Sequence, residues 1–321
     1  MDSMFKIEQD QRVVFVGLVC VDLFNVLPTY PIEDQGHRCL DCYWQRGGNA
    51  SNSATVFSLL GGNAEFLGTL SNDKELDFIQ NDFNEYNIKF DNSVIVPNVS
   101  CPMSVVIISQ ETKTRTILHT NKNLPELSLD DFKEKIDLNS HFIQWIHFEG
   151  RDNACEISKM LIHIKQHNED RKSVDIAYKQ IITSLEAEKL RLAPGLDKYN
   201  VWGLPDVMFI SKDFAKSQGY NTMAEVVSGY LPKLKKGAIV ICAWGEEGAA
   251  ANSDQTGIVT SPAFPPETVR DTCGAGDTFV AATIFALSQG QSLLKAITFG
   301  CTVAGAKCGM QGFKGLSKIT S

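Results

Sequence analysis

The strongest constraint on the fold is an alternation of short apolar runs with helix-like segments over most of the chain. Residues 13–21 form a continuous β-rich run, which is typical of a strand buried on both faces. Further strands are predicted at residues 64–70, 142–148, 173–177, 207–211 and 238–243. Helices are predicted at residues 49–60, 76–86, 156–167, 182–192, 222–234, 278–289 and 292–307. This order predicts an α/β fold with a doubly wound, mostly parallel sheet and helices on both faces.

Two early stretches have a different pattern. About residues 22–46 and 97–120, apolar and polar residues interleave, and residues 103–109 and 115–120 flank a turn-like Gln-Glu-Thr-Lys segment. Such hairpin-like strands predict a small antiparallel sheet that projects from the main sheet. The sequence contains no linker-like or low-complexity segment and no internal repeat, so we expect a single domain over residues 1–321.

Composition narrows the class of protein. The 321 residues include 30 Lys and Arg against 38 Asp and Glu, a formal charge of −8, which disfavours general nucleic-acid binding. No apolar run approaches the ~18 residues of a membrane span, and residues 1–12 are too polar for a secretion signal. The nine cysteines are an odd number without framework spacing. We therefore expect reduced thiols in a cytosolic protein, with the Cys39 and Cys42 pair as ordinary thiols.

Polar residues near the start of the chain suggest a site for hydroxyl groups. Asp22 directly follows the first apolar run, so it is either a ligand-facing acid at a strand end or a turn residue. The segment Gly47-Gly48-Asn49-Ala50-Ser51-Asn52 then opens a predicted helix. Asn49 alone could be an N-cap, but Asn49 and Asn52 share one helix face. The pair of amides favours a polyol site, which Gly48 would allow a ligand to approach closely.

The motif Asp-Thr-Cys-Gly-Ala-Gly-Asp-Thr-Phe at residues 271–279 carries the clearest signal. Gly274, Ala275 and Gly276 precede an apolar helix, so their backbone N–H groups and the helix dipole favour an anion. Asp277 follows immediately, and a carboxylate beside an anion site suits phosphoryl transfer to an alcohol. A glycine turn with a capping Asp is the alternative, although the length of the motif favours the chemical interpretation.

Two further features could contact a nucleotide. The segment Trp-Gly-Glu-Glu-Gly at residues 244–248 follows a predicted strand, and it is either a nucleotide-flanking turn or an ordinary β-turn. Arg115 lies on the predicted hairpin and could reach a phosphate or simply face solvent. The chain contains no G-x-x-x-x-G-K-[ST], so it is not a P-loop kinase, and the absence of G-x-G-x-x-G after the first strand argues against a dinucleotide enzyme.

The segments at residues 47–52 and 271–277 resemble the two signature motifs of the ribokinase/PfkB carbohydrate kinases. Longer strings at residues 44–53, 145–151, 211–213, 242–248 and 308–313 are similar to the family members that phosphorylate ketohexoses. The resemblance implies transfer of phosphate from ATP to O1 of D-fructose, a requirement for Mg²⁺, and a homodimer in which the small β-sheets act as lids that clasp each other.

The resemblance also implies roles for individual residues. Asp277 would be the catalytic base. Sugar hydroxyls would be bound by Asp22, Gly48, Asn49, Asn52 and Asp277. ATP would be bound by Arg115, Gly245, Glu246, Glu247, Gly248, Gly274, Ala275 and Gly276. Metal ligands are not assigned.

Residues 173–203 depart from the family pattern, which has a Glu followed by Lys-Pro-Arg after a strand. Two alternatives therefore stay open beside a fructose kinase. One is a kinase of the same family for ribose or a nucleoside, and the other is a non-catalytic sugar sensor. The presence of Asp277 argues against the sensor.

Overall fold

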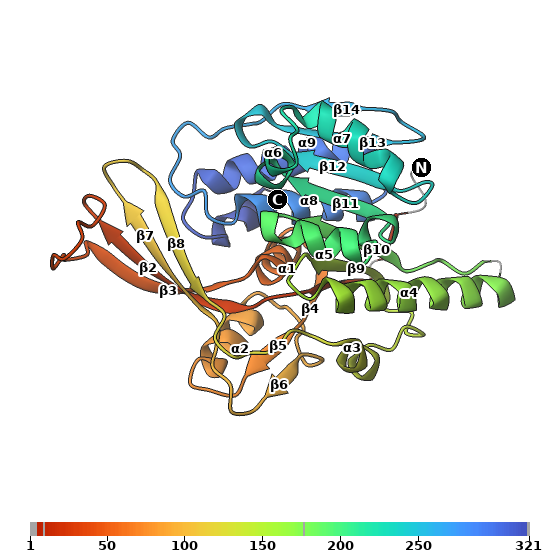
Figure 1. Ribbon diagram of the computed structural model, residues 1–321, viewed down its shortest axis with the longest axis horizontal. Helices are drawn as coiled ribbons and strands as arrows, with labels where there is room; N and C mark the ends of the chain where they lie inside the picture. Colours follow the sequence, from red (N-terminus) through yellow and green to blue (C-terminus); the bar gives the residue numbers. More distant parts are fainter. Residues whose placement is uncertain (1–4, 9, 176, 320–321) are drawn as a thin grey trace.

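An eight-stranded sheet forms the centre of the computed structural model, which describes residues 5–8, 10–175 and 177–319 (Figure 1). The strand order is β14-β13-β12-β11-β10-β9-β1-β4. The strands from β12 to β4 are all parallel, whereas β13 and β14 are antiparallel and close one edge. Their bounds are β1 Arg12–Val16, β4 Asn63–Leu67, β9 Ile143–Glu149, β10 Ile182–Ala187, β11 Val207–Ser211, β12 Ile239–Ala243, β13 Ala249–Ser253 and β14 Val259–Ser261. The predicted doubly wound α/β fold is confirmed, although the two edge strands were not predicted.

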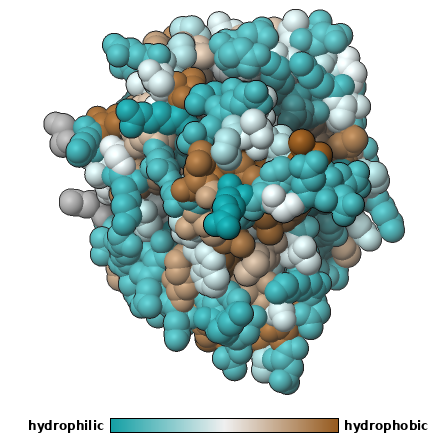
Figure 2. Space-filling model, turned by 90° about the vertical axis from the view of Figure 1, so that its left-hand side faces the viewer, coloured by the Kyte–Doolittle hydropathy of each residue, from teal (hydrophilic) through white to brown (hydrophobic). Residues whose placement is uncertain are grey.

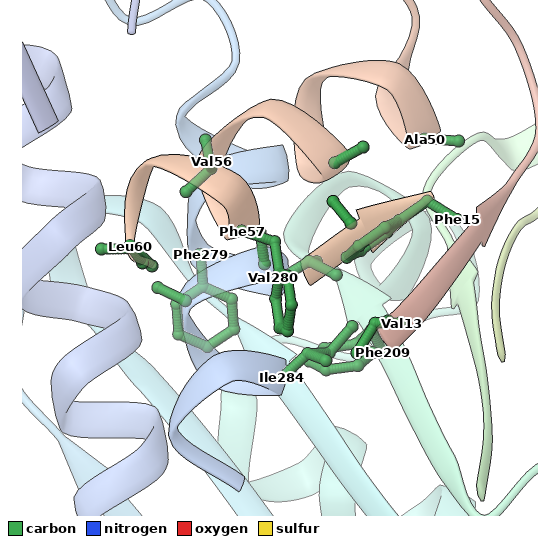
Figure 3. Close-up of a cluster of buried hydrophobic side chains, with 14 of the residues drawn as sticks. Val13, Phe15, Ala50, Val56, Phe57, Leu60, Phe209, Phe279, Val280 and Ile284 are labelled. Atoms are coloured by element: carbon green, nitrogen blue, oxygen red, sulfur yellow. The ribbon is translucent and has the colours of Figure 1, made fainter. Parts of the chain in front are cut away.

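Helices cover both faces of this sheet and bury two separate apolar cores. On one face pack α1 (Asn49–Leu59), α8 (Ala275–Ser288) and α9 (Leu293–Cys308); on the other pack α4 (Ala154–Val174), α5 (Ala193–Lys198), α6 (Lys212–Ser217) and α7 (Met223–Tyr230). Alternate residues of one strand enter opposite cores: Val13 and Phe15 face α1 and α8, whereas Val14 faces α4. Figure 3 shows the first core, where Phe57 of α1 and Val280 of α8 meet the strands.

A four-stranded sheet projects from one end of the molecule (Figure 1). Its order is β3-β2-β7-β8, with β2 Cys20–Leu27, β3 Asp41–Gly47, β7 Met103–Ser109 and β8 Arg115–Thr120. The two outer pairings are antiparallel, as expected, and the central pairing of β2 with β7 is parallel. Beside it lie α2 (Leu76–Glu85) and the two-stranded sheet of β5 (Thr69–Ser71) and β6 (Val94–Val96), whereas α3 (Leu129–Lys135) packs against α4.

Two segments differ from the prediction. Residues 173–177 are not a strand: α4 continues to Val174, and residue 176 lies outside the described residues. Residues 182–192 are not a helix but β10 followed by a 3₁₀ turn at Leu190–Leu192. Every residue of β10 is buried, so it lacks the polar alternation of a half-exposed strand. The spacing of its apolar residues Ile182 and Leu185 imitates a helical turn.

Candidate active site

A cavity of about 560 Å³ opens at the carboxyl ends of the central parallel strands, next to the projecting sheet. The beginnings of α1 and α8, the end of β10 and the inner side of β7 and β8 all contribute to its wall. The cavity brings together most of the predicted site residues: Asp22, Gly48, Asn49, Asn52, Arg115, Gly245, Gly274, Ala275, Gly276 and Asp277. Glu246, Glu247 and Gly248 are not among the described residues that line it.

The glycine-rich segment before α8 forms the floor of the cavity at one end. Gly274 is the N-cap residue of α8, with a left-handed backbone (φ 75°). A Cβ at this position would lie 2.5 Å from the ring of Phe313, so a side chain is excluded on both conformational and steric grounds. The first turn of α8, from Ala275 to Asp277, lines the cavity. The N–H of Ala275 donates to the carbonyl oxygen of Thr272 at 3.3 Å, whereas the N–H groups of Gly276 and Asp277 have no partner within the helix.

Asp277 lies in this first turn and is buried, with 7% of its surface exposed. Asn52 Nδ2 donates a hydrogen bond to Asp277 Oδ2 at 2.8 Å. Burial, and secondarily the charge of Glu188, raises the pKa of Asp277 to about 7. A carboxyl group with this pKa can accept a proton near neutral pH, which is the property that a general base requires.

The two asparagines of α1 are held by acids rather than by the helix terminus. Asn49 Nδ2 donates to Glu188 Oε2 at 2.7 Å, and the N-cap of α1 is Gly48, so Asn49 is not a capping residue. Asn52 Oδ1 is buried and has no hydrogen-bond partner among the described residues. A buried acceptor without a partner is costly, and a ligand hydroxyl entering the cavity would satisfy it.

Asp22 lines the cavity, but it does not follow the first strand of the large sheet as expected. The apolar run at residues 13–21 is divided between β1 and β2, and Asp22 lies inside β2 of the projecting sheet. Its neighbour Gly47 leaves no space for a side chain, since a Cβ there would lie 2.1 Å from Asp22 Oδ2. Burial raises the pKa of Asp22, and the hydroxyl of Ser104 and the thiol of Cys20 donate hydrogen bonds to it.

Three acids at the carboxyl ends of the central parallel strands were missed by the sequence analysis. Glu149 ends β9, Glu186 lies in β10, and Glu188 follows it, and all three line the cavity. Burial, followed by the charges of Glu188 and Asp277, raises the pKa of Glu186 well above its usual range. The Glu149 carboxylate is held by hydrogen bonds at both oxygens. Its Oε2 accepts from the backbone N–H of Leu18 at 2.9 Å, and its Oε1 accepts from Arg151 at 3.0 Å.

The segment after β10 also corrects the expected departure from the family pattern. Glu188-Lys189-Leu190-Arg191 follows the strand directly, so three of the four residues of the Glu-Lys-Pro-Arg pattern are present, beginning eleven positions after the end of the strand predicted at residues 173–177. Lys189 forms an ion pair with Glu188. The β-favouring stretch Ile-Ile-Thr-Ser-Leu at residues 181–185, followed by Glu186 and Glu188, was the signal that could have located this strand end.

Arg115 and Gly245, which were also predicted to bind a nucleotide, both line the cavity. Arg115 of β8 donates a hydrogen bond to the hydroxyl of Thr272, just before the glycine-rich segment. Gly245 lines the wall after β12, whereas Glu246 turns outward and pairs with Lys212 at 2.7 Å. Within the described ranges, no group of three or more His, Cys, Asp or Glu side chains is arranged to hold a metal ion.

Comparisons with known proteins agree with this geometry. The family model described as pfkB family carbohydrate kinase matches residues 10–316. The chain is 42% identical over 308 residues to the Ketohexokinase of Mus musculus, which covers 96% of this chain and 99% of that protein. None of the helices in the described ranges is long and apolar enough to cross a membrane.

Solved structures show the same fold at low identity. The ribokinase of Giardia lamblia matches with a TM-score of 0.76 and 16% identity, over 95% of this chain and 96% of that one. The ribokinase of Arabidopsis thaliana, complexed with ribose and ATP, matches with a TM-score of 0.73 and 17% identity, over 95% of each chain. The family match and the 42% identity together show that this chain belongs to the pfkB family of carbohydrate kinases.

Proposed function

We propose that this protein transfers the γ-phosphoryl group of ATP to O1 of D-fructose, giving fructose 1-phosphate and ADP. The substrate is inferred from the 42% identity to mouse Ketohexokinase over nearly the full length of both chains. The observation that carries the chemistry is Asp277, a buried carboxyl group with its pKa raised to about 7, in the first turn of a helix whose N-terminus lines the cavity.

The sugar would bind between α1 and the projecting sheet. Asp22, Asn49 and Asn52 line this part of the cavity, and their carboxylate and amide groups can both accept from and donate to hydroxyls. The free Oδ1 of Asn52 would accept a hydrogen bond from one of them. Gly48 has a φ of 100° and a Cβ there would lie 2.2 Å from the carbonyl oxygen of Leu18, so only glycine leaves the backbone in this position.

The reaction would proceed by in-line displacement. Asp277 accepts the proton of the O1 hydroxyl as O1 bonds to the γ-phosphorus, and the bond from that phosphorus to the bridging oxygen breaks, releasing ADP. The N–H groups at Gly274, Ala275 and Gly276 stabilise the charge on the transferred group. Arg115 and Gly245 would contact the nucleotide; Glu246, Glu247 and Gly248, outside the lining, would act only by shaping the turn.

The acids at the strand ends suit a magnesium ion. Burial, followed by the charges of Glu188, Asp277 and Glu149, raises the pKa of Glu186, and a divalent cation nearby would offset the repulsion among these carboxylates. Mg²⁺ prefers oxygen ligands and is commonly held by one or two carboxylates together with substrate phosphates and water. Glu186 and Glu188 are therefore the residues that would hold Mg²⁺, which when bound supplies charge neutralisation to the phosphates of ATP.

We further propose that the projecting sheet is a lid and a dimer contact in a cytosolic enzyme. Its β8 carries the exposed Leu118, and Leu40 and Trp44 are exposed on or beside β3. Figure 2 faces this end of the molecule and shows apolar patches between hydrophilic side chains. Exposed apolar area of this kind is typical of an interaction surface, and a second copy of the sheet would cover it and exclude water from the site.

The test is ADP release by the purified protein with Mg-ATP and a panel of fructose, ribose, adenosine, glucose and no sugar, followed by phosphorus NMR of the product. We expect fructose-dependent turnover with phosphate on C1. Asp277→Asn should keep sugar binding and lower kcat by about 10²–10⁴-fold. Turnover with ribose or adenosine instead would reassign the substrate, and binding without turnover would indicate a sensor.

A further inference from the structure

Lys307 of α9 is completely buried, with 0% of its surface exposed. A lysine without solvent contact is rare, because an ammonium group inside a protein is costly unless it is paired. Its Nζ donates to Asp271 Oδ2 at 2.5 Å and to the backbone carbonyl oxygen of Asp271 at 3.0 Å. The ammonium also lies 5.5 Å from the ring centroid of Phe313. All these partners flank the glycine-rich segment, although Lys307 is not among the described residues that line the cavity.

Asp271 connects Lys307 to the glycine-rich segment through hydrogen bonds of its carboxylate. Its Oδ1 accepts from the backbone N–H of Cys273 at 2.8 Å, and its Oδ2 accepts from the N–H of Gly312 at 3.2 Å. The ring of Phe313, which Lys307 contacts from one side, lies where a Cβ of Gly274 would be. One buried ammonium group thus joins the end of α9, residues 312–313 and the start of the segment that leads into α8.

The ion pair between Lys307 and Asp271 also affects the charge beside the anion site. Asp271 orders the segment, but a lone carboxylate there would also repel a polyphosphate bound at the N-terminus of α8. Lys307 supplies the compensating charge from inside the protein, so the segment keeps the hydrogen bond to Cys273 without a net negative charge beside the anion site.

We infer that Lys307 is a positioning residue for the nucleotide half of the reaction: it fixes the 271–276 segment and neutralises Asp271, without touching substrate. This inference rests on the proposed function only for the identity of the ligand. The inference predicts different effects on the two substrates. Loss of Lys307 should weaken nucleotide binding and loosen the segment, while the sugar contacts at Asn49 and Asn52 on α1 remain.

The test compares Lys307→Met with the wild type by calorimetric binding of Mg-ADP, by KM for ATP and for fructose, and by hydrogen exchange of the amides of residues 272–277. Lys314→Met is the matched control, because Lys314 lies near the same end of the chain as Lys307, is 71% exposed and pairs with the exposed Glu85. We expect Lys307→Met to weaken Mg-ADP binding about 10–100-fold, because Asp271 then places an uncompensated negative charge beside the polyphosphate. Exchange at 272–277 should rise, with the fructose KM changed less than about twofold.

The double variant Asp271→Asn, Lys307→Met keeps the test decisive if the single variant folds poorly, because it leaves no buried charge without a partner. We expect its Mg-ADP affinity to lie within about tenfold of the wild type, and an affinity reduced by about 10–100-fold would overturn the neutralising role. Unchanged Mg-ADP affinity and exchange in Lys307→Met, or equal rises in both KM values with faster exchange throughout the chain, would overturn the positioning role. Absence of fructose turnover in the wild type would refute the proposed function alone, since the affinity ratio and the exchange rates would still be measured.

Discussion

Replacing the proposed base should make the protein more stable while it removes activity. Asp277 is buried and its pKa is raised from the ordinary 3.8 to about 7, mainly by burial. When the pKa of a carboxyl group is higher in the folded than in the unfolded state, the free energy of unfolding falls as the pH rises from the unfolded pKa to the folded pKa. At about 1.4 kcal/mol per pKa unit, ionisation of Asp277 lowers the free energy of unfolding by ~4 kcal/mol at pH 8 and by only ~1.5 kcal/mol at pH 5.

Asp277→Asn removes the charge but keeps the shape and an oxygen that can accept the hydrogen bond from Asn52. With about 2.1 cal/mol/K per residue, a chain of this length gains ~1.5 °C in Tm per kcal/mol. We therefore expect the variant to melt ~6 °C above the wild type at pH 8 and ~2 °C above it at pH 5. Differential scanning calorimetry at both pH values measures this, with the exposed Asp213→Asn at the cavity rim as the control. A rise in Tm that is the same at both pH values, or a fall in Tm at pH 8, would contradict the raised pKa of Asp277 in the folded state.

Three further predictions follow from individual contacts. Glu188→Gln removes a charge that raises the pKa of Asp277, so the acidic limb of the kcat/KM profile should move to lower pH; a limb that stays near pH 7 would contradict the coupling. Gly274→Ala places a Cβ 2.5 Å from Phe313 at a φ of 75°, and urea titration should show a loss of ~1–3 kcal/mol, whereas Gly219→Ala, also at positive φ but with open space around it, isolates the backbone contribution. His147 is buried with its pKa lowered to about 3, so its contribution to stability is present above pH 6.5 and is lost as pH falls. His147→Gln should flatten the decline in Tm between pH 6.5 and pH 4, and an unchanged slope would show that His147 does not titrate on unfolding.

The sequence was sufficient for the site residues that belong to a helix start, and insufficient for those that belong to a fully buried strand. Asn49, Asn52 and Asp277 lie in the first turns of α1 and α8, where glycines mark the start and spacing determines the shared face. Glu186 lies in β10, whose neighbours on both sides are buried, so no periodicity distinguishes it from a helix. The error over residues 173–192 therefore concealed the acids that we propose for magnesium.

Asp22 illustrates a different limit. Its place after an apolar run was interpreted as the end of a strand in the large sheet, but the chain leaves that sheet at Val16 and enters the projecting sheet at Cys20. The break is a turn of three residues, Gly17 to Val19, inside a continuous apolar sequence. Only tertiary packing, such as the bond from the N–H of Leu18 to Glu149, makes the change of direction visible.

The parallel pairing of β2 with β7 has a consequence for how the chain is made. A parallel pair cannot close through a short turn, and here roughly 75 residues, including α1 and α2, separate Leu27 from Met103. On a ribosome that adds about 5–20 residues per second, one edge of β2 would wait some 4–15 s for its partner strand. During that interval a strand with buried Val21, Phe24 and Leu27 presents an open edge, so the nascent chain carries this aggregation-prone edge until residue 103 emerges. Synthesis speed and chaperone supply should therefore affect the yield of this protein more strongly than the stability of its finished fold would suggest.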